Sequence, residues 1–438
     1  MHNNKQLRFF CYSFCFILYF CTFLYAETLE IVLPVLSDKA GIISEEDAKK
    51  SENIFAEAVS AAKEKKRTET VRLLLQVLEI NPDNKEIRTL LGWQSDKENW
   101  KTAWEIDRLK RGFTNHPDFG WLPSANVSRY EKGERFAPKF GWISKEDETL
   151  LRSDIRSGWE IVTEHYDLKT DHSMEKGTGT ARQLEQLYRG WQLLFLGFIL
   201  DDNVLLRLAD GKVIPPAVQR HQVFLYRDKQ DYVTCLQGVE PRIAVSNGYY
   251  YPKTRRAYFF PPSDDMDSFD AETVRKTIFH EGTHQLFQEN RSAAKLMPGV
   301  KQNFFLVEGI AMFAETFRVE NRNGKNCFVF GDKNDERLAA AIHHLFNEQF
   351  YVSFSKLTRA GAEDFQSHQK LAKLYSQAAA MTHFLMFADN GKYRENTVQL
   401  LRLIYSGLDK PDSLSVLTGK SYEELDKEYA AFLSRIDE

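Results

Sequence analysis

Apolar side chains recur at helical spacing through the first quarter of the chain. One run begins after Ser44, a second ends at the Pro-Asp turn at 81–84, and a third follows that turn. This spacing predicts short helical hairpins from about residue 44 to residue 110. A helix pair broken by a Pro-Asp turn resembles one tetratricopeptide-like unit, and fewer than two units are present. We expect residues 27–112 to form a small helical region, either a packing module or a surface where a partner protein docks.

The hydrophobic pattern changes twice after this region. Residues 113–155 are rich in turn-forming and aromatic positions and predict a linker that packs on its neighbours. Further along, strands are predicted at about 159–168, 223–226 and 248–260, a helix at 174–195, another helix at 271–290, and helices almost throughout from there to the C-terminus. A strand-rich half, a central helix and a helical half predict an α+β domain over residues 156–438.

The central helix carries the sequence His-Glu-Gly-Thr-His at 280–284. His280 and His284 are four positions apart, so on a helix both rings project from one face and can bind one Zn²⁺. Glu281 lies about a third of a turn away, where the general base for a zinc-activated water is expected. The pattern would occur by chance in roughly one such chain in fifty. The sequence therefore predicts a catalytic zinc site on this helix.

Glu308 is the candidate for the third zinc ligand. It follows His284 by 24 residues and lies in an almost entirely apolar helical segment. An unpaired carboxylate buried there costs several kcal/mol, so it should bind metal or pair with an arginine such as Arg318. Glu315 is seven residues further on the same helical face. It could accept the free N–H of a ligand histidine, or it is an ordinary surface or ion-paired glutamate.

Two glycines lie within the predicted metal-binding helices. Glycine inside a helix costs about 1 kcal/mol relative to alanine, so Gly282 and Gly309 need a physical reason. Close approach of the two helices would explain both. The alternative for Gly309 is that it ends a turn.

Three aromatic residues are candidates for contact with substrate. Tyr258 and Phe259 lie in a predicted strand that ends twenty residues before His280. Such a strand either pairs with an extended peptide through its main chain or is a plain core strand. Tyr375 begins a strongly apolar helix, where its phenol could donate to the oxyanion of a tetrahedral intermediate or simply start the helix.

Composition places the chain among ordinary globular proteins. The 438 residues are 43% hydrophobic and 27% charged, with a net charge of −4, which gives no sign of nucleic-acid binding. Three of the five cysteines precede residue 27. The other two, Cys235 and Cys327, are a candidate disulfide or two separate buried thiols.

The N-terminus has the pattern of a secretory signal. Lys5 and Arg8 precede an uncharged segment at 9–25, and Ala26 is followed by a charged residue. Cleavage after Ala26 predicts a secreted, periplasmic or cell-surface protein. The alternative is an uncleaved anchor, which would place the protein at a membrane.

Four motifs together resemble a known group of proteins. They are HEGTHQLF at 280–287, VEGIAMFAE at 307–315, YSQAAAMTHFL at 375–385 and SYEELDKEYAAFL at 421–433. In this combination the chain, from about residue 159 to its end, resembles an uncharacterised family of secreted bacterial proteins related to the peptidase MA-like, or gluzincin, zinc metallopeptidases.

The resemblance implies a zincin-like fold and a definite set of roles. His280, His284 and Glu308 would bind zinc, and Glu281 would act as general base on a peptide or protein substrate. The chain departs from the better-known gluzincins at Met312, where an acidic residue often stands. We therefore expect a secreted zinc metallopeptidase, with a catalytically inactive, zinc-stabilised binding or scaffold protein at the cell surface as the alternative.

Overall fold

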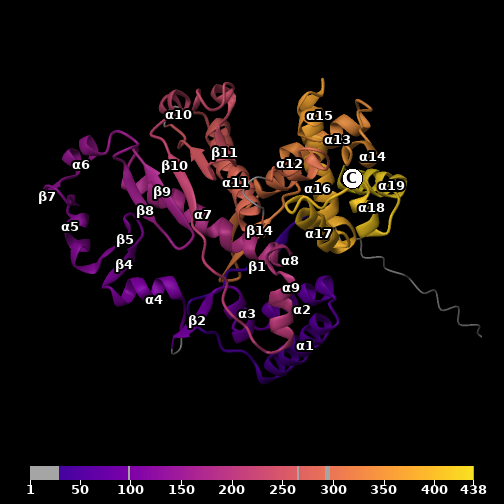
Figure 1. Ribbon diagram of the computed structural model, residues 1–438, viewed down its shortest axis with the longest axis horizontal. Helices are drawn as coiled ribbons and strands as arrows, with labels where there is room; N and C mark the ends of the chain where they lie inside the picture. The colour runs from indigo at the N-terminus through magenta and orange to yellow at the C-terminus, as the bar shows by residue number, and fades with distance from the viewer. Residues whose placement is uncertain (1–28, 97–98, 264–265, 292–295, 438) are drawn as a thin grey trace, which may run out of the picture.

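The computed structural model describes residues 29–96, 99–263, 266–291 and 296–437, which form a mixed α+β structure (Figure 1). The expected signal segment at 1–26 lies outside the described residues. Within the described part of the chain, no helix is long and apolar enough to cross a membrane.

The N-terminal helices form one compact layer, drawn in indigo in Figure 1. They are α1 (Glu45–Lys63), α2 (Arg67–Ile80) and α3 (Lys85–Leu90). The side chain of Ser44 accepts a hydrogen bond from the Asp47 N–H and so starts α1. Ala58 and Leu74 are fully buried, and α9 (Asp202–Ala209) packs against α1. The helices predicted for this region are confirmed up to residue 90.

Three consecutive hairpin–helix units replace the predicted end of the helical region and the predicted linker. Their elements are β2 (Trp93–Asp96), β3 (Asn99–Thr102) and α4 (Ala103–Lys110), then β4 (Phe113–His116), β5 (Gly120–Pro123) and α5 (Val127–Glu131), then β6 (Glu134–Ala137), β7 (Gly141–Ser144) and α6 (Lys145–Leu151). The second and third units form the arm on one side of Figure 1.

The units are an internal sequence repeat of about 21 residues. Trp100, Trp121 and Trp142 hold the same place in each second strand, and Gly92, Gly112 and Gly133 begin the units with φ of +90°, +77° and +88°. Such positive φ values favour glycine, because other residues rarely adopt them. The turn-rich composition of 113–155 therefore comes from tight hairpins rather than from a linker.

A five-stranded sheet in the order β11-β12-β10-β9-β8 forms the centre of the molecule. Its strands are β8 (Trp159–Val162), β9 (Tyr166–Thr170), β10 (His221–Leu225), β11 (Gly248–Tyr251) and β12 (Arg256–Phe259). The pair β10–β9 and the pair β10–β12 are parallel, and both outer pairs are antiparallel. The predicted strands in this region are confirmed.

Two long helices, α7 (Met174–Leu194) and α11 (Ser268–Arg291), pack on the sheet and on each other. The strand residues alternate between faces, so Val223 and Phe259 enter the main core while Tyr258 enters a smaller cluster. That cluster includes residues of α10 (Lys229–Leu236). A short helix, α8 (Leu196–Ile199), continues from α7.

The C-terminal half is mainly helical and packs beside α11. Its helices are α12 (Phe304–Ala314), α13 (Glu336–Phe346), α14 (Phe354–Leu357), α15 (Ala362–Gln366), α16 (Leu371–Gly391), α17 (Arg394–Ile404), α18 (Ser413–Thr418) and α19 (Tyr422–Asp437). A hairpin of β13 (Arg318–Arg322) and β14 (Lys325–Phe330) interrupts them, and β1 (Ile31–Pro34) completes its sheet. The prediction of an almost wholly helical C-terminal half missed this hairpin.

Candidate metal centre

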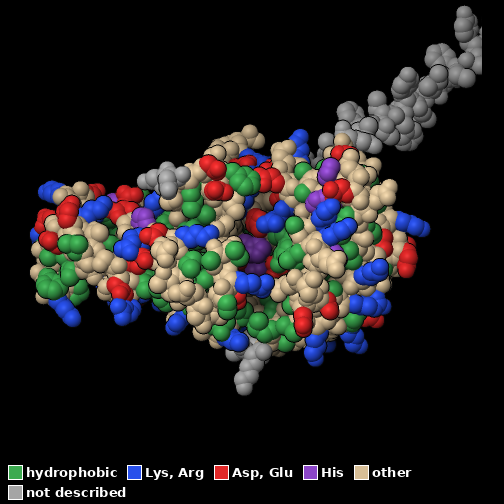
Figure 2. Space-filling view, turned by 90° about the horizontal axis from the view of Figure 1, so that it is seen from above, with side chains coloured by type: hydrophobic (Ala, Val, Ile, Leu, Met, Phe, Trp, Pro, Cys, Tyr) green, Lys and Arg blue, Asp and Glu red, His purple; other side chains and the backbone are tan. Residues whose placement is uncertain are grey.

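The two motif histidines share one face of α11. The His280 and His284 side chains are 15% and 16% exposed, and their Nε2 atoms are 3.2 Å apart. The helix backbone alone brings the rings together, because residues four positions apart lie one above the other. Figure 2 shows histidine side chains at the bottom of a hollow near the middle of the face it displays.

Helix α12 brings Glu308 to the same point. One carboxylate oxygen lies 3.8 Å from the Nε2 of His280, and the other lies 3.9 Å from the Nε2 of His284. One donor atom from each residue can be chosen so that all three lie within 4.8 Å of one another. Donors bound to a tetrahedral zinc at about 2.0–2.1 Å are separated by about 3.3 Å. These residues could therefore hold a metal ion with little movement.

The donor set itself suits zinc. Two imidazole nitrogens and one carboxylate are the ligands of a catalytic zinc site, which keeps a further position open. The expected alternative for Glu308, an ion pair with Arg318, does not form. Arg318 instead pairs with Glu30 and Glu320. The residues present fit the metal that the motif implies.

Glu315 contacts the ring nitrogen of His280 that does not face Glu308. Its carboxylate lies 2.8 Å from Nδ1 of His280, so the ring donates there and turns the lone pair of Nε2 toward Glu308. Arg337, at the start of α13, donates two hydrogen bonds of 2.9 and 3.0 Å to Glu315. Sequence reasoning missed Arg337, because no spacing pattern links it to the motif.

Glu281 is held by the main chain of the edge strand. The Tyr250 N–H of β11 donates to one carboxylate oxygen at 2.8 Å. Burial raises the pKa of Glu281 to about 7, although the charge of His280 and this hydrogen bond act in the other direction. A carboxyl group with a pKa near neutrality can both take up and release a proton under physiological conditions. The contact with Tyr250 was not predicted either.

The ionisable groups of the centre depend strongly on one another. Burial lowers the pKa of His280, but the hydrogen bond and charge of Glu315 outweigh it and raise the pKa to about 9. Burial and the charge of His280 hold the pKa of His284 well below its ordinary value. Burial raises the pKa of Glu308. These shifts describe the protein without metal, whose ligands must lose their protons when an ion binds.

The two glycines make close contacts, but not with each other's helices. A Cβ on Gly309 would lie 2.1 Å from the Thr382 Oγ1 of α16, and one on Gly282 would lie 3.1 Å from Leu187 of α7. The expectation that they allow α11 and α12 to approach is therefore wrong for Gly282, and the nearest atoms to Gly309 belong to α16 rather than to α11. Gly309 also does not end a turn, since it lies inside α12. Each glycine instead lets its helix pack on a neighbouring helix.

The predicted peptide-binding strand is in the interior of the sheet. Strand β12, with Tyr258 and Phe259, is paired on both sides, by β10 and β11. Phe259 is fully buried and Tyr258 is 8% exposed. The prediction that this strand pairs with substrate is wrong, because it has no free edge. The edge strand next to α11 is β11.

Tyr375 lies on the side of the centre formed by α16. Burial raises the pKa of its phenol, and the negative charges of Glu308 and Glu281 add to the shift. The ring meets Phe365 edge to face, with centroids 5.3 Å apart. The phenol is thus in electrostatic range of the metal-site carboxylates, and its part in a reaction stays a prediction.

The two cysteines of the folded region are free thiols. Cys235 lies on α10 and is exposed, and Cys327 lies on β14 and is partly exposed. Of the two alternatives drawn from the sequence, the disulfide does not form, and neither thiol is buried.

No protein-family model matches this chain, and no curated protein matches it significantly. The resemblance to peptidase MA-like enzymes therefore rests on the sequence motifs alone.

Proposed function

We propose that this protein is a secreted zinc-dependent hydrolase that cleaves peptide bonds, with a zincin-like catalytic domain after a small tetratricopeptide-like region. The observation that carries the proposal is the convergence of His280, His284 and Glu308 with Glu281 beside them. When bound, Zn²⁺ would supply a Lewis acid that polarises a carbonyl oxygen and lowers the pKa of a water molecule.

The roles of the protein's own residues follow from their contacts. Glu315 and Arg337 orient His280, so that its Nε2 can serve as a metal ligand. Glu281, positioned by the Tyr250 N–H, would take the proton of the attacking water at a carboxylate oxygen and pass it to the leaving amine. Tyr375 is the candidate donor to the oxyanion.

The substitution Glu281→Gln tests the proposal, because the amide keeps the shape of the side chain but cannot accept a proton. We expect the wild type to cleave members of a broad peptide library, and the variant to be slower by about 10²–10⁴-fold while keeping its zinc. Glu272→Gln, an exposed change on the same helix, is the matched control and should leave the rate unchanged.

The alternative of a zinc-stabilised binding protein predicts a different outcome. In that case the wild type would hold zinc and cleave nothing in the library, and Glu281→Gln would have no measurable effect. Equal rates in Glu281→Gln and in the wild type would also reject Glu281 as the base.

A further inference from the structure

A second candidate site lies between the hairpin–helix units and the main body, and it shares no residue with the candidate metal centre. It is a cavity of about 350 Å³, here called the N-terminal cavity. Its walls come from α7, β8 and the turn after it, the first two hairpin–helix units, the segment after β1, and the β13–β14 hairpin. Pockets of this size hold a small molecule or a single side chain.

Charge is distributed unevenly around this cavity. Four carboxylates line it, and two arginines are the cationic side chains among the lining residues. The carboxylates are Asp38, Glu105, Glu164 and Glu185, and the arginines are Arg182 and Arg189. When all six are ionised, the lining carries two more negative than positive charges.

Two of the carboxylates already have close partners. Arg189 donates to Glu164 at 2.6 Å. Both oxygens of Glu185 are bonded by His165, one by its N–H and one by its ring, each at 2.8 Å. Arg182 is turned to the carbonyl oxygen of Pro117. Among the residues that the structure describes, neither arginine of the lining forms an ion pair with the other two carboxylates.

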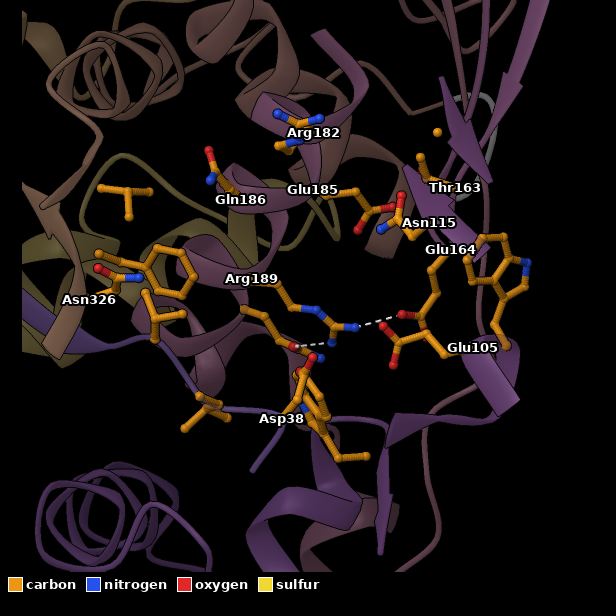
Figure 3. A pocket seen from close by; sticks show the side chains of 18 of the residues that line it. Asp38, Glu105, Asn115, Thr163, Glu164, Arg182, Glu185, Gln186, Arg189 and Asn326 are labelled. Carbon is orange, nitrogen blue, oxygen red and sulfur yellow. Dashed lines mark hydrogen bonds and ion pairs between the residues drawn. The ribbon is translucent and has the colours of Figure 1, made fainter. Parts of the chain in front are cut away.

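Glu105 and Asp38 are these remaining carboxylates. Glu105 accepts a backbone hydrogen bond of 2.9 Å from Thr102, as part of the capping box of α4. Figure 3 shows Glu105 beside Glu164, with Arg189 pointing toward both and Asp38 below Arg189 in this view. Glu105 is partly buried and Asp38 is exposed. Burial raises the pKa of Glu105, and the negative charge of Asp38 adds to this shift. The carboxylates therefore repel one another, and a further cation would relieve the repulsion.

Three tryptophan side chains form part of the lining of the N-terminal cavity. Trp104 and Trp121 line the cavity and meet edge to face, with ring centroids 5.2 Å apart. Trp93 lines it as well, with the Arg189 guanidinium 5.0 Å from its ring centroid. Indole rings attract ammonium and guanidinium groups through their faces and pack on the aliphatic stems that carry them.

The geometry points to a binding site for an organic cation, an ammonium or guanidinium group on an apolar stem, with Glu105 and Asp38 as its carboxylate partners and Trp104 and Trp121 as its walls. A lysine or arginine side chain of a peptide and a free alkylamine both carry this chemistry. Burial raises the pKa of Glu164 to about 7, so a bound cation would also favour its ionised form.

The test is calorimetric titration of the whole protein with n-pentylamine, its neutral analogue n-pentanol, and a short blocked peptide containing one lysine. We expect pentylamine to bind with a dissociation constant on the order of 1 mM or below, and pentanol to bind at least about tenfold more weakly. A peptide that binds more tightly than pentylamine would identify a protein side chain as the ligand. A weaker peptide would identify a free amine.

The repeat supplies a matched control for the key residue. Asp147 holds the same place in α6 as Glu105 in α4, three residues after the capping Ser144 and Thr102 respectively, and it does not line the cavity. Glu105→Gln should weaken pentylamine binding about tenfold, and Asp147→Asn should not change it. Equal affinities in these two variants would overturn the proposal. The proposal would also be overturned if pentanol bound with the same affinity as pentylamine. It would likewise be overturned if a neutral oligosaccharide bound to the protein while pentylamine and the lysine peptide did not.

Discussion

The candidate metal centre and the N-terminal cavity both bring several carboxylates together, but the spaces that these carboxylates surround differ in size. At the metal centre, the donor atoms of His280, His284 and Glu308 lie within 4.8 Å of one another. In the cavity, Glu105 and Glu164 face a space of about 350 Å³ with indole walls. The first spacing suits a bare ion, and the second suits a molecular cation with an apolar stem.

This comparison shows that an excess of negative charge does not by itself determine which kind of cation a site binds. The candidate metal centre contains two histidines, whose imidazole nitrogens can share lone pairs with a metal once His280 has lost its extra proton, whereas the cavity is lined by carboxylates, arginines and tryptophans and by no histidine. We therefore expect changes in one region to leave binding in the other intact.

The largest expected effect is that of Glu308→Gln, which removes the charged oxygen ligand. Loss of a residue that only supports a metal ligand lowers metal affinity by about 10–100-fold, so loss of a ligand itself should lower zinc affinity by more than this. Pentylamine affinity should stay the same. Competition with a chelator of known affinity measures the first, and calorimetry measures the second. Loss of amine binding in this variant would show that the two regions are one site, and the comparison would fail.

Glu315→Gln should have the next largest effect, because it weakens the contact that orients His280. We expect zinc affinity to fall by about 10–100-fold. Glu320→Gln is its control, since Glu320 also pairs with arginines, but on β13 rather than at the metal centre. If both variants bind zinc with equal affinity, Glu315 has no role in orienting His280 as a zinc ligand.

Gly309→Ala tests the packing beneath the metal centre. The added methyl group would meet Thr382 Oγ1 at 2.1 Å and the Ala378 carbonyl oxygen at 2.8 Å, so thermal or denaturant unfolding should show a loss of about 1–3 kcal/mol. Gly179 on α7, near the N-terminal cavity, has open space around its Cβ position. Gly179→Ala should instead add up to about 1 kcal/mol to the free energy of unfolding. Equal stabilities of the two variants would contradict the packing of α12 on α16.

The smallest expected effect is the pH dependence of cation binding. The pKa of Glu164 is about 7, because burial raises it, Arg189 lowers it, and Glu185 and Glu105 raise it further. Below this pKa the carboxyl is neutral and attracts a cation less. Pentylamine affinity should therefore fall by up to about tenfold between pH 8 and pH 6. Glu164→Gln should flatten this dependence, and an unchanged slope in that variant would exclude Glu164 as its source.

The convergence of His280, His284 and Glu308 could be predicted largely from the sequence, because these residues lie on two helices with regular spacing. A separation of four residues places two rings on one face, and a lone glutamate in an apolar helix needs a partner. Arg337 and the Tyr250 N–H could not be predicted in this way. They reach the centre through tertiary packing of α13 and β11, which no local pattern records.

The N-terminal cavity could not be predicted from the sequence, because its walls come from segments far apart in the chain. Asp38, Glu105, Glu164 and Asn326 meet only after folding. One signal was present and was missed. The tryptophans of the three units recur 21 residues apart, and this period identifies the repeat that forms one wall.

Metal analysis of the wild type and of His284→Ala tests the central claim most directly. After saturation with Zn²⁺ and extensive dialysis, the wild type should retain about one zinc ion per chain. His284→Ala should retain almost none while keeping its helical circular dichroism. His343→Ala, a change of a largely exposed histidine away from the centre, should retain the ion. A folded wild type that holds no zinc, or a His284→Ala variant that holds as much as the wild type, would contradict the account.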